Sequence, residues 1–186
     1  MRAATRDSLL PQLARVFRER GYEGATLTQL SAATGLGKAS LYHHFPGGKS
    51  EMAEVLVRQA IADAERLAFG RLYGAQPASE RLAAFVDGFA AYLEQADGLC
   101  LLGVLALGSA RDSHGAEITA QFRDWQGALI RALEEGGAKP KRAARIAAEA
   151  INLLYGAQVA ARLLGDPAQV PRALKRVSRK LTGALR

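Results

Sequence analysis

Residues 25–49, ATLTQLSAATGLGKASLYHHFPGGK, are the stretch of this chain that decides its fold. Thr26 is a residue type that caps helix N-termini, and the apolar spacing after it predicts a helix over about residues 27–34. Gly35-Leu36-Gly37 predicts a tight turn, because glycine adopts positive φ without steric cost. A second short helix is expected over residues 38–45, before a proline and two glycines end it.

The second of these helices is expected to have one buried and one outward side. Leu41 and Phe45 stand four residues apart and face the core, which leaves small and polar groups on the other side. In a helix-turn-helix, the N-terminal end of this helix meets base edges in the major groove of DNA. Lysine and serine side chains suit base edges or phosphates, and a lysine at the start of the next helix suits a phosphate. The candidate DNA contacts are Thr26, Thr28, Lys38, Ala39, Ser40, Tyr42, His43, His44 and Lys49.

Helix pairs with a glycine turn occur in many all-α proteins, so spacing alone leaves DNA binding open. The ordered polar and aromatic series after the turn favours it. From Gly21-Tyr22-Glu23 through Leu41-Tyr42-His43-His44-Phe45 to Lys49, the chain resembles the N-terminal domain of TetR-family transcriptional regulators. The junction Phe45-Pro46-Gly47-Gly48-Lys49 resembles the branch of that family that includes LmrA and YxaF.

This resemblance implies an all-α homodimer that binds a palindromic operator in double-stranded DNA. It also implies a pocket in the body of the protein, whose small-molecule ligand releases the DNA. One departure is Gly37, where a serine or threonine commonly caps the recognition helix; glycine caps less well by only a few tenths of a kcal/mol. The resemblance further implies that Tyr42 and Lys49 contact phosphates. It implies that Lys38, Ser40 and His43 read bases.

Composition and charge agree with an all-α protein of the cytoplasm. Nearly half of the 186 residues are hydrophobic, mainly alanine and leucine, which favour helices. No run of about 18 apolar residues predicts a membrane span, and a single cysteine excludes an internal disulfide. Residues 138–186 carry 11 basic and 2 acidic residues, which indicates either a solvated helix face or a further contact with a polyanion.

We expect about nine helices in two domains. A three-helix head over residues 1–48 is the helix-turn-helix domain, and residues 49–186 form a helical body for ligand binding and dimerisation. Ser8 is expected to cap the first helix, and Gly21 to end it. The later helices are expected at about residues 49–73, 79–95, 99–110, 116–135, 141–164 and 171–185.

The body holds most of the aromatic residues, and as a set they suggest a mostly apolar pocket for a small lipophilic effector. For any single one of them, a place in the core is the simpler interpretation. Tyrosine and tryptophan carry donors that need partners when buried, which Asn152 and Gln158 can supply. The predicted pocket residues are Phe69, Tyr73, Phe85, Phe89, Tyr92, Cys100, Phe122, Trp125, Asn152 and Tyr155.

The last two helices are the predicted dimer interface. The helix over about residues 141–164 is rich in alanine, with Gly156 near its middle, and small residues allow helices to approach closely. The final helix has one apolar stripe and basic residues on its other side. Two such helices from each subunit make a four-helix interface, although the stripe also fits the core of a monomer. The predicted interface residues are Leu153, Ala157, Ala160, Leu164, Leu174, Val177 and Leu181.

Catalytic, metal and cofactor sites are not expected. Gly48-Lys49-Ser50 resembles the end of a phosphate-binding loop, but the leading glycine and the strand before it are missing. His43 and His44 are adjacent, so on a helix they point about 100° apart and cannot grip one metal together. Cys100 near a helix start fits a redox sensor or, more simply, an inert buried thiol. The rival function is a helical protein-interaction adaptor with a degenerate head.

Overall fold

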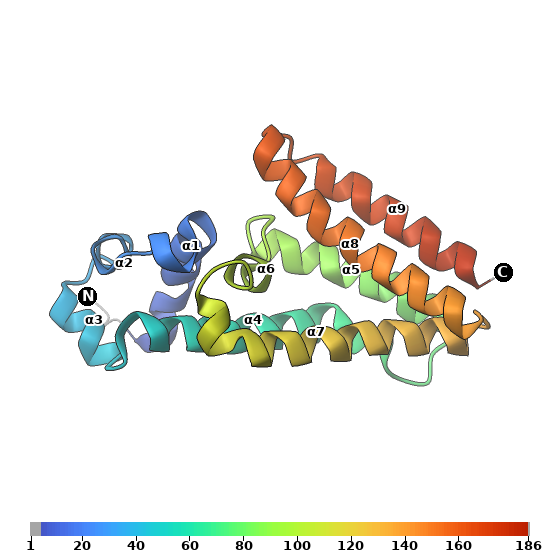
Figure 1. The fold of residues 1–186 in the computed structure, drawn as a ribbon, viewed down its shortest axis with the longest axis horizontal. Coiled ribbons are helices and arrows are strands. Elements are labelled where there is room, and N and C mark those ends of the chain that lie inside the picture. The colour runs from blue at the N-terminus through green and yellow to red at the C-terminus, as the bar shows by residue number, and fades with distance from the viewer. Residues whose placement is uncertain (1–4, 186) are drawn as a thin grey trace. The chain divides into compact units, whose positions relative to one another are not determined.

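A computed structural model describes residues 5–185, apart from the side chains of residues 111 and 113 (Figure 1). Every regular element in this range is helical, so the prediction of an all-α fold with about nine helices is confirmed. The elements are α1 (Arg6–Gly24), α2 (Leu27–Thr34), α3 (Lys38–His44), α4 (Gly48–Leu67), the 3-10 helix η1 (Phe69–Leu72), α5 (Ala78–Gln95), α6 (Leu101–Leu105), α7 (Ala110–Glu135), α8 (Pro140–Leu164) and α9 (Gln169–Ala184).

The chain folds as two compact units. The first contains the chain up to Ile61 together with Leu101–Ile118, and the second contains Ala62–Cys100 together with the chain from Thr119 on. Helices α4 and α7 each contribute residues to both units. The first unit therefore holds more than the three helices of the expected head, and the domain boundary after residue 48 stays a prediction.

Helix α1 begins one turn earlier than expected. Thr5, not Ser8, is its N-cap, and the two residues form a capping box in which each side chain accepts the other's backbone N–H. Gly21 interrupts the helical geometry with φ 69° and ψ −178°, close to the predicted end. The helix therefore places its last turn, residues 21–24, at an angle set by this break.

The core of the first unit joins α1 to α2 and α6, and α2 to α3. Several of its large apolar side chains are completely buried, and the prediction that Leu41 and Phe45 face inward is confirmed. Burying a leucine or phenylalanine side chain stabilises a fold by roughly 1.5–3 kcal/mol. The leucine, phenylalanine and methionine side chains of this unit with 0% exposure are Leu13, Phe17, Leu30, Leu41, Phe45, Met52, Leu102 and Leu105.

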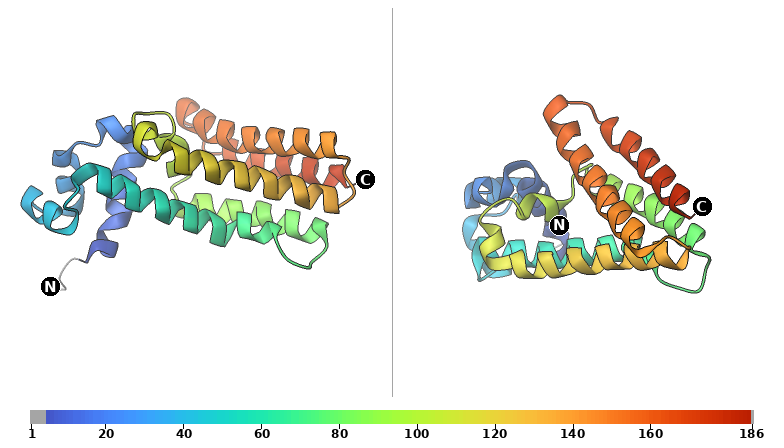
Figure 2. Two further views of the ribbon diagram at one scale, coloured as in Figure 1. Left: turned by 60° about the horizontal axis from the view of Figure 1, so that its bottom comes forward. Right: turned by 45° about the vertical axis from the view of Figure 1, so that its right-hand side comes forward.

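In the second unit, α9 packs against both α8 and α5, and α5 also packs against η1. Figures 1 and 2 show α8 and α9 as a pair of neighbouring helices joined by a short turn at Gly165. The apolar stripe of α9 is buried in this arrangement through Ala173, Val177, Leu181 and Ala184.

Three predicted helix limits are wrong. Helix α4 ends at Leu67 rather than near residue 73, because α5 crosses its end at Gly88. A Cβ atom at Gly88 would lie 1.8 Å from the carbonyl oxygen of Leu67, so only glycine allows this approach. Helix α6 covers five residues rather than twelve, and α7 begins at Ala110 and runs through His114-Gly115, where a break was expected. A single glycine inside a helix costs only about 1 kcal/mol, which the helix tolerates.

Among the helices of residues 5–185, none has the length and apolar character to cross a membrane.

Candidate DNA-binding surface and body groove

Helix α2 begins with a capping box. Thr26 Oγ1 accepts the Gln29 N–H at 3.3 Å, and Gln29 Oε1 accepts the Thr26 N–H at 3.1 Å. The Thr26 hydroxyl also donates to Gln29 Oε1, so it is already engaged inside its own helix. Thr26 and Thr28 are both exposed, as their predicted role requires.

The turn between α2 and α3 is fixed by side-chain hydrogen bonds to the backbone. The Ser31 hydroxyl donates to the Leu36 carbonyl across the turn, and the Thr34 hydroxyl donates to the Leu30 carbonyl at 2.8 Å. Gly35 adopts φ 69°, as the sequence predicted. These bonds set the angle at which α3 leaves α2.

Helix α3 presents its N-terminal residues to solvent. Lys38, Ala39 and Ser40 are all exposed, while Leu41 on the opposite side is completely buried. His43 is exposed and His44 is half-buried, with their ring centres 5.6 Å apart. Gly37 caps the helix without a side-chain hydrogen bond, as expected from its lack of a hydroxyl.

The ring of Tyr42 packs closely against Gly48. Its side chain is 45% exposed, and its ring lies against the start of α4. Gly48 has φ 64°, and a Cβ atom there would meet Tyr42 Cε1 at 3.2 Å. Glycine is therefore favoured at this position both by the backbone and by the contact with the tyrosine ring.

Lys49 is held by Tyr22 at the end of α1. Its ammonium donates to the Tyr22 carbonyl at 3.0 Å and lies 4.4 Å from the centre of the Tyr22 ring. An ammonium has three protons, so one hydrogen bond leaves donors for a further oxygen. The side chain is half-buried, which fixes its position beside α3 within the same unit.

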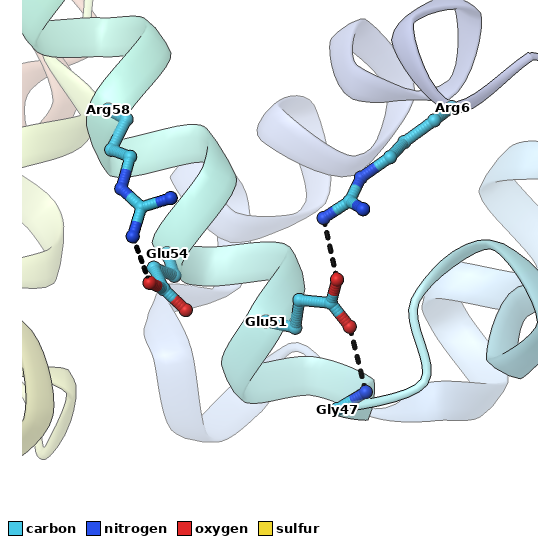
Figure 3. A network of polar contacts seen from close by, with 5 residues as sticks. All are labelled: Arg6, Gly47, Glu51, Glu54 and Arg58. Atoms are coloured by element: carbon cyan, nitrogen blue, oxygen red, sulfur yellow. Dashed lines mark hydrogen bonds and ion pairs between the residues drawn. The ribbon is translucent and has the colours of Figure 1, made fainter.

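Glu51, which was not among the predicted site residues, joins α4 to α1 and to the turn that follows α3 (Figure 3). One carboxylate oxygen of Glu51 accepts a hydrogen bond from the Arg6 guanidinium at 2.6 Å, and the other accepts one from the Gly47 N–H at 2.7 Å. The same guanidinium lies 4.8 Å from the centre of the Phe45 ring. An acidic residue in the first turn of a helix, four residues after a glycine, was the sequence signal for this role.

Glu23 connects the end of α1 to the segment between α6 and α7. Its carboxylate accepts the backbone N–H of Ser109. The hydrogen bonds from Ser109 lower the pKa of Glu23 from its ordinary value of 4.5 to about 2, and the charge of Lys49 acts in the same direction. The carboxylate therefore stays ionised across the physiological range.

The second unit gathers seven of the predicted pocket aromatics into one cluster. Trp125 stacks on Phe69 with ring centres 4.2 Å apart and an interplanar angle of 3°, and its indole N–H donates to Glu65 at 2.8 Å. Most of these side chains pack against one another with 4% exposure or less, as residues of a core do. The clustered residues are Phe69, Phe85, Phe89, Tyr92, Phe122, Trp125 and Tyr155.

Two predicted pocket residues lie outside this cluster. Tyr73 follows η1 rather than continuing a helix, so its ring is 47% exposed and lies 5.9 Å from the guanidinium of Arg131. Asn152 lies on the exposed side of α8. Both side chains are exposed, and their assignment to the ligand pocket stays a prediction.

Cys100 is completely enclosed by polar groups and rings of the cluster. Its sulfur lies 3.3 Å from the hydroxyl of Tyr92 and 3.5 Å from that of Tyr155. Its backbone N–H donates to the side-chain oxygen of Gln158 at 2.7 Å, and the Gln158 amide donates to the Leu154 carbonyl at 3.0 Å. Burial, reinforced by the neighbouring thiol, raises the pKa of Tyr155 well above its usual range.

The predicted dimer residues divide between core and surface. Val177 and Leu181 are 0% and 1% exposed within one protomer, because the stripe of α9 faces α5 and α8. These two assignments to the interface are wrong. Leu164 is 69% exposed, whereas Leu153, Ala157, Ala160 and Leu174 are half-buried. Val159 and Leu163, which were not among the predicted interface residues, are 49% and 80% exposed on α8.

A groove of about 790 Å³ opens within the second unit, where α5 and α8 end and α9 begins. None of the predicted aromatic residues lines it, but Gln158, which was predicted as a polar partner in the pocket, does. Of the predicted interface residues, Leu174 lines it. No sequence signal marks the groove, because residues from three separate helices form it. Its lining residues are Ala90, Leu93, Glu94, Asp97, Gly98, Leu99, Gln158, Ala161, Arg162, Gly165, Pro167, Val170, Pro171 and Leu174.

An exposed recognition helix on a buried hydrophobic support, followed by a body of helices, defines a DNA-binding transcriptional regulator of the helix-turn-helix class. Residues 9–56 match the family described as "Bacterial regulatory proteins, tetR family". Residues 78–178 match "Transcriptional regulator LmrA/YxaF-like, C-terminal domain". The chain belongs to the TetR family, in its LmrA/YxaF-like branch, and this is a family of regulators rather than enzymes.

Individual relatives agree with this assignment. The HTH-type transcriptional regulator LmrA of Bacillus subtilis (strain 168) is 39% identical over 66 residues, which is 32% of this chain and 35% of that protein. The HTH-type transcriptional repressor DhaR of Mycobacterium sp. (strain GP1) is 30% identical over 139 residues, covering 73% of this chain and 68% of DhaR. A TetR transcriptional regulator from Chloroflexus aurantiacus J-10-FL has the same fold, with 25% identity, a TM-score of 0.77, and coverage of 95% and 93%.

Proposed function

We propose that the protein is a repressor that binds a palindromic operator as a homodimer and leaves it when a small lipophilic molecule binds the body. The observation that carries the DNA-binding role is the exposure of Lys38, Ala39 and Ser40 on a helix whose opposite side is completely buried. Such a helix can enter the major groove without unfolding any part of its support.

The head residues divide by the chemistry of their targets. Lys38, Ser40 and His43 read base edges, since all three are exposed on α3. Tyr42 and Lys49 bind phosphates, because both are held in fixed positions by neighbouring residues and carry free donors. Thr26, Thr28, Ala39 and His44 lie around this surface and complete it.

A palindromic operator requires a two-fold axis in the protein. The exposed side of α8 supports a homodimer because it offers Gly156 for close approach and two large apolar side chains, Val159 and Leu163. The comparison with DhaR, which is named a repressor, supports repression as the direction of control. Because the target is genomic DNA, we place the protein in the cytoplasm.

The release step follows from the requirements of any ligand-driven switch. An effector shifts the protein off DNA only if it binds the released conformation more tightly than the DNA-bound one. The apolar groove of the second unit supports such a role, because it is the size of sites that hold small organic molecules.

Binding selection from randomised duplex DNA with the purified protein tests this function. We expect an enriched inverted repeat, with half-sites separated by about one helical turn. A Ser40→Ala variant should enrich a repeat altered at the bases that Ser40 contacts. If no sequence is enriched, the proposed function is overturned in favour of a helical protein-interaction adaptor with a degenerate head.

A further inference from the structure

We propose that the groove between the ends of α5 and α8 and the start of α9 is the effector site, and that its ligand is a small organic cation with an apolar body. This inference rests on the proposed function and deepens it. The aromatic cluster, which the sequence favoured for this role, is closely packed with its own side chains.

The groove has the volume and the walls of a ligand site. Its volume of about 790 Å³ lies within the range of roughly 300–1,000 Å³ that small-molecule sites occupy. Leucine, valine, alanine and proline side chains from all three helices form most of the surface. An apolar body of a ligand can therefore bury part of its surface there, and burial of apolar surface is a main favourable contribution to binding.

The charge of the groove favours a cation. Glu94 and Asp97 lie on its wall, against one positive side chain, Arg162. The carboxyl ends of α5 and α8 both reach the groove, and each helix C-terminus carries a partial negative charge. At the positive N-terminus of α9, Asp166 accepts the Ala168 N–H at 3.0 Å and pairs with Arg172 at 2.8 Å.

One wall of the groove has an unusual backbone. Asp97 has φ 51°, and within residues 5–185 it is the one residue other than glycine with positive φ. Gly98 follows with φ 75°. Glycine adopts such a φ without steric cost, whereas for Asp97 it costs free energy. Strained residues of this kind persist where the surroundings impose them, and they cluster at ligand sites and switch regions. A ligand that contacts these residues can change the conformation of the turn between α5 and α6.

A residue of the groove is hydrogen-bonded to the point where the chain passes from the second unit into the first. Gln158 lines the groove and accepts the backbone N–H of Cys100 at 2.7 Å. Cys100 is the last residue of the second unit before Leu101, and Leu101–Ile118 belongs to the unit that contains the helix-turn-helix. Release of this hydrogen bond by a bound ligand would free the residue that immediately precedes α6.

Two probes with the same tail and opposite heads test the site and the ligand class without DNA. We expect decyltrimethylammonium, well below its micelle-forming concentration, to bind the full-length protein at least tenfold more tightly than decyl sulfate in calorimetry. Ala90→Phe places a ring in the groove and should weaken binding of the cation at least tenfold. Ala83→Phe, at an exposed position two turns earlier on α5, is the matched control and should leave binding unchanged.

Equal binding of the two probes, or no binding, overturns the ligand class. Binding that survives Ala90→Phe overturns the site, provided that circular dichroism shows both variants folded. The link to α6 is tested by hydrogen exchange at the Cys100 amide, which should quicken when the cation binds and also in Gln158→Leu without ligand. Unchanged exchange on binding overturns the link. Failure of the proposed function is a separate result, because it appears in the DNA selection and not in these measurements.

Discussion

The ammonium of Lys49 donates to the carbonyl of Tyr22 at 3.0 Å and lies over the tyrosine ring at 4.4 Å. The ring itself stacks on Phe17, with centres 6.1 Å apart. The position of this charge is therefore fixed by the end of α1 before any DNA is bound. A side chain that is already ordered loses less conformational entropy when it binds a phosphate.

Lys49→Ala should weaken binding to all DNA sequences alike. Loss of one phosphate contact should flatten the dependence of log affinity on log salt by about one unit, because one fewer counterion is released. Titrations of one operator and one unrelated duplex at several salt concentrations measure this. Lys175→Ala removes an exposed charge from α9 and is the control. An unchanged slope for Lys49→Ala excludes its phosphate contact.

Gly48→Ala should lower both stability and DNA affinity. The position has φ 64°, which costs a residue with a Cβ atom about 1–2 kcal/mol, and the new methyl group would also meet the Tyr42 ring.

Gly37→Ser is the contrasting change, because φ is −66° there and no atom lies within 4 Å of a new Cβ. It adds a helix cap and should raise the free energy of unfolding by a few tenths of a kcal/mol. Urea denaturation measures the free energy of unfolding of both variants, which should fall for Gly48→Ala and rise for Gly37→Ser. An unchanged free energy of unfolding in Gly48→Ala would contradict the predicted strain at this position.

Glu51→Ala should destabilise the first unit by about 1 kcal/mol, because the Gly47 N–H loses its acceptor and Arg6 loses its partner. Figure 3 also supplies the control, since Glu54 pairs with Arg58 on the same helix at an exposed position. Glu54→Ala should cost about 0.5 kcal/mol or less. Equal losses in the two variants would show that Glu51 is an ordinary surface ion pair.

The lowered pKa of Glu23 predicts a dependence of stability on pH. A carboxyl group whose pKa falls from 4.5 to about 2 on folding stabilises the folded state above pH 4.5, and this contribution is lost as pH falls toward 2. Thermal unfolding of the wild type and of Glu23→Gln over this range measures it. The wild type should melt at the higher temperature at pH 6, and the two curves should converge near pH 2. Curves that run parallel through the whole range would rule out a link between Glu23 and folding.

Local chemistry made the head predictable from sequence. The capping threonine at residue 26, the turn at Gly35, and the four-residue spacing of Leu41 and Phe45 act over less than two helical turns, and the structure confirms each of them. The candidate DNA contacts on α3 follow from that spacing, because a buried side of a short helix determines its exposed side.

Contacts between distant residues made the body harder to predict. The early end of α4 depends on Gly88, more than 20 residues later, and the partner of Cys100 is Gln158 on another helix. The apolar stripe of α9 fits a dimer interface and a protomer core equally well as a pattern. Only the packing of α9 on α5 and α8 shows that Val177 and Leu181 belong to the core.

The exposed side of α8 is the remaining candidate for the dimer interface, and Leu163 is its most exposed large apolar residue at 80%. Leu163→Glu should convert the homodimer to a monomer, because two glutamates near a two-fold axis repel each other and remain partly desolvated. Affinity for a palindromic operator should fall about 100-fold or more, since the two half-sites are then bound independently. Leu107→Glu is the matched control, because Leu107 is 85% exposed and lies outside α8. Light scattering after gel filtration gives the mass of each variant, and a Leu163→Glu dimer would place the two-fold axis on another surface.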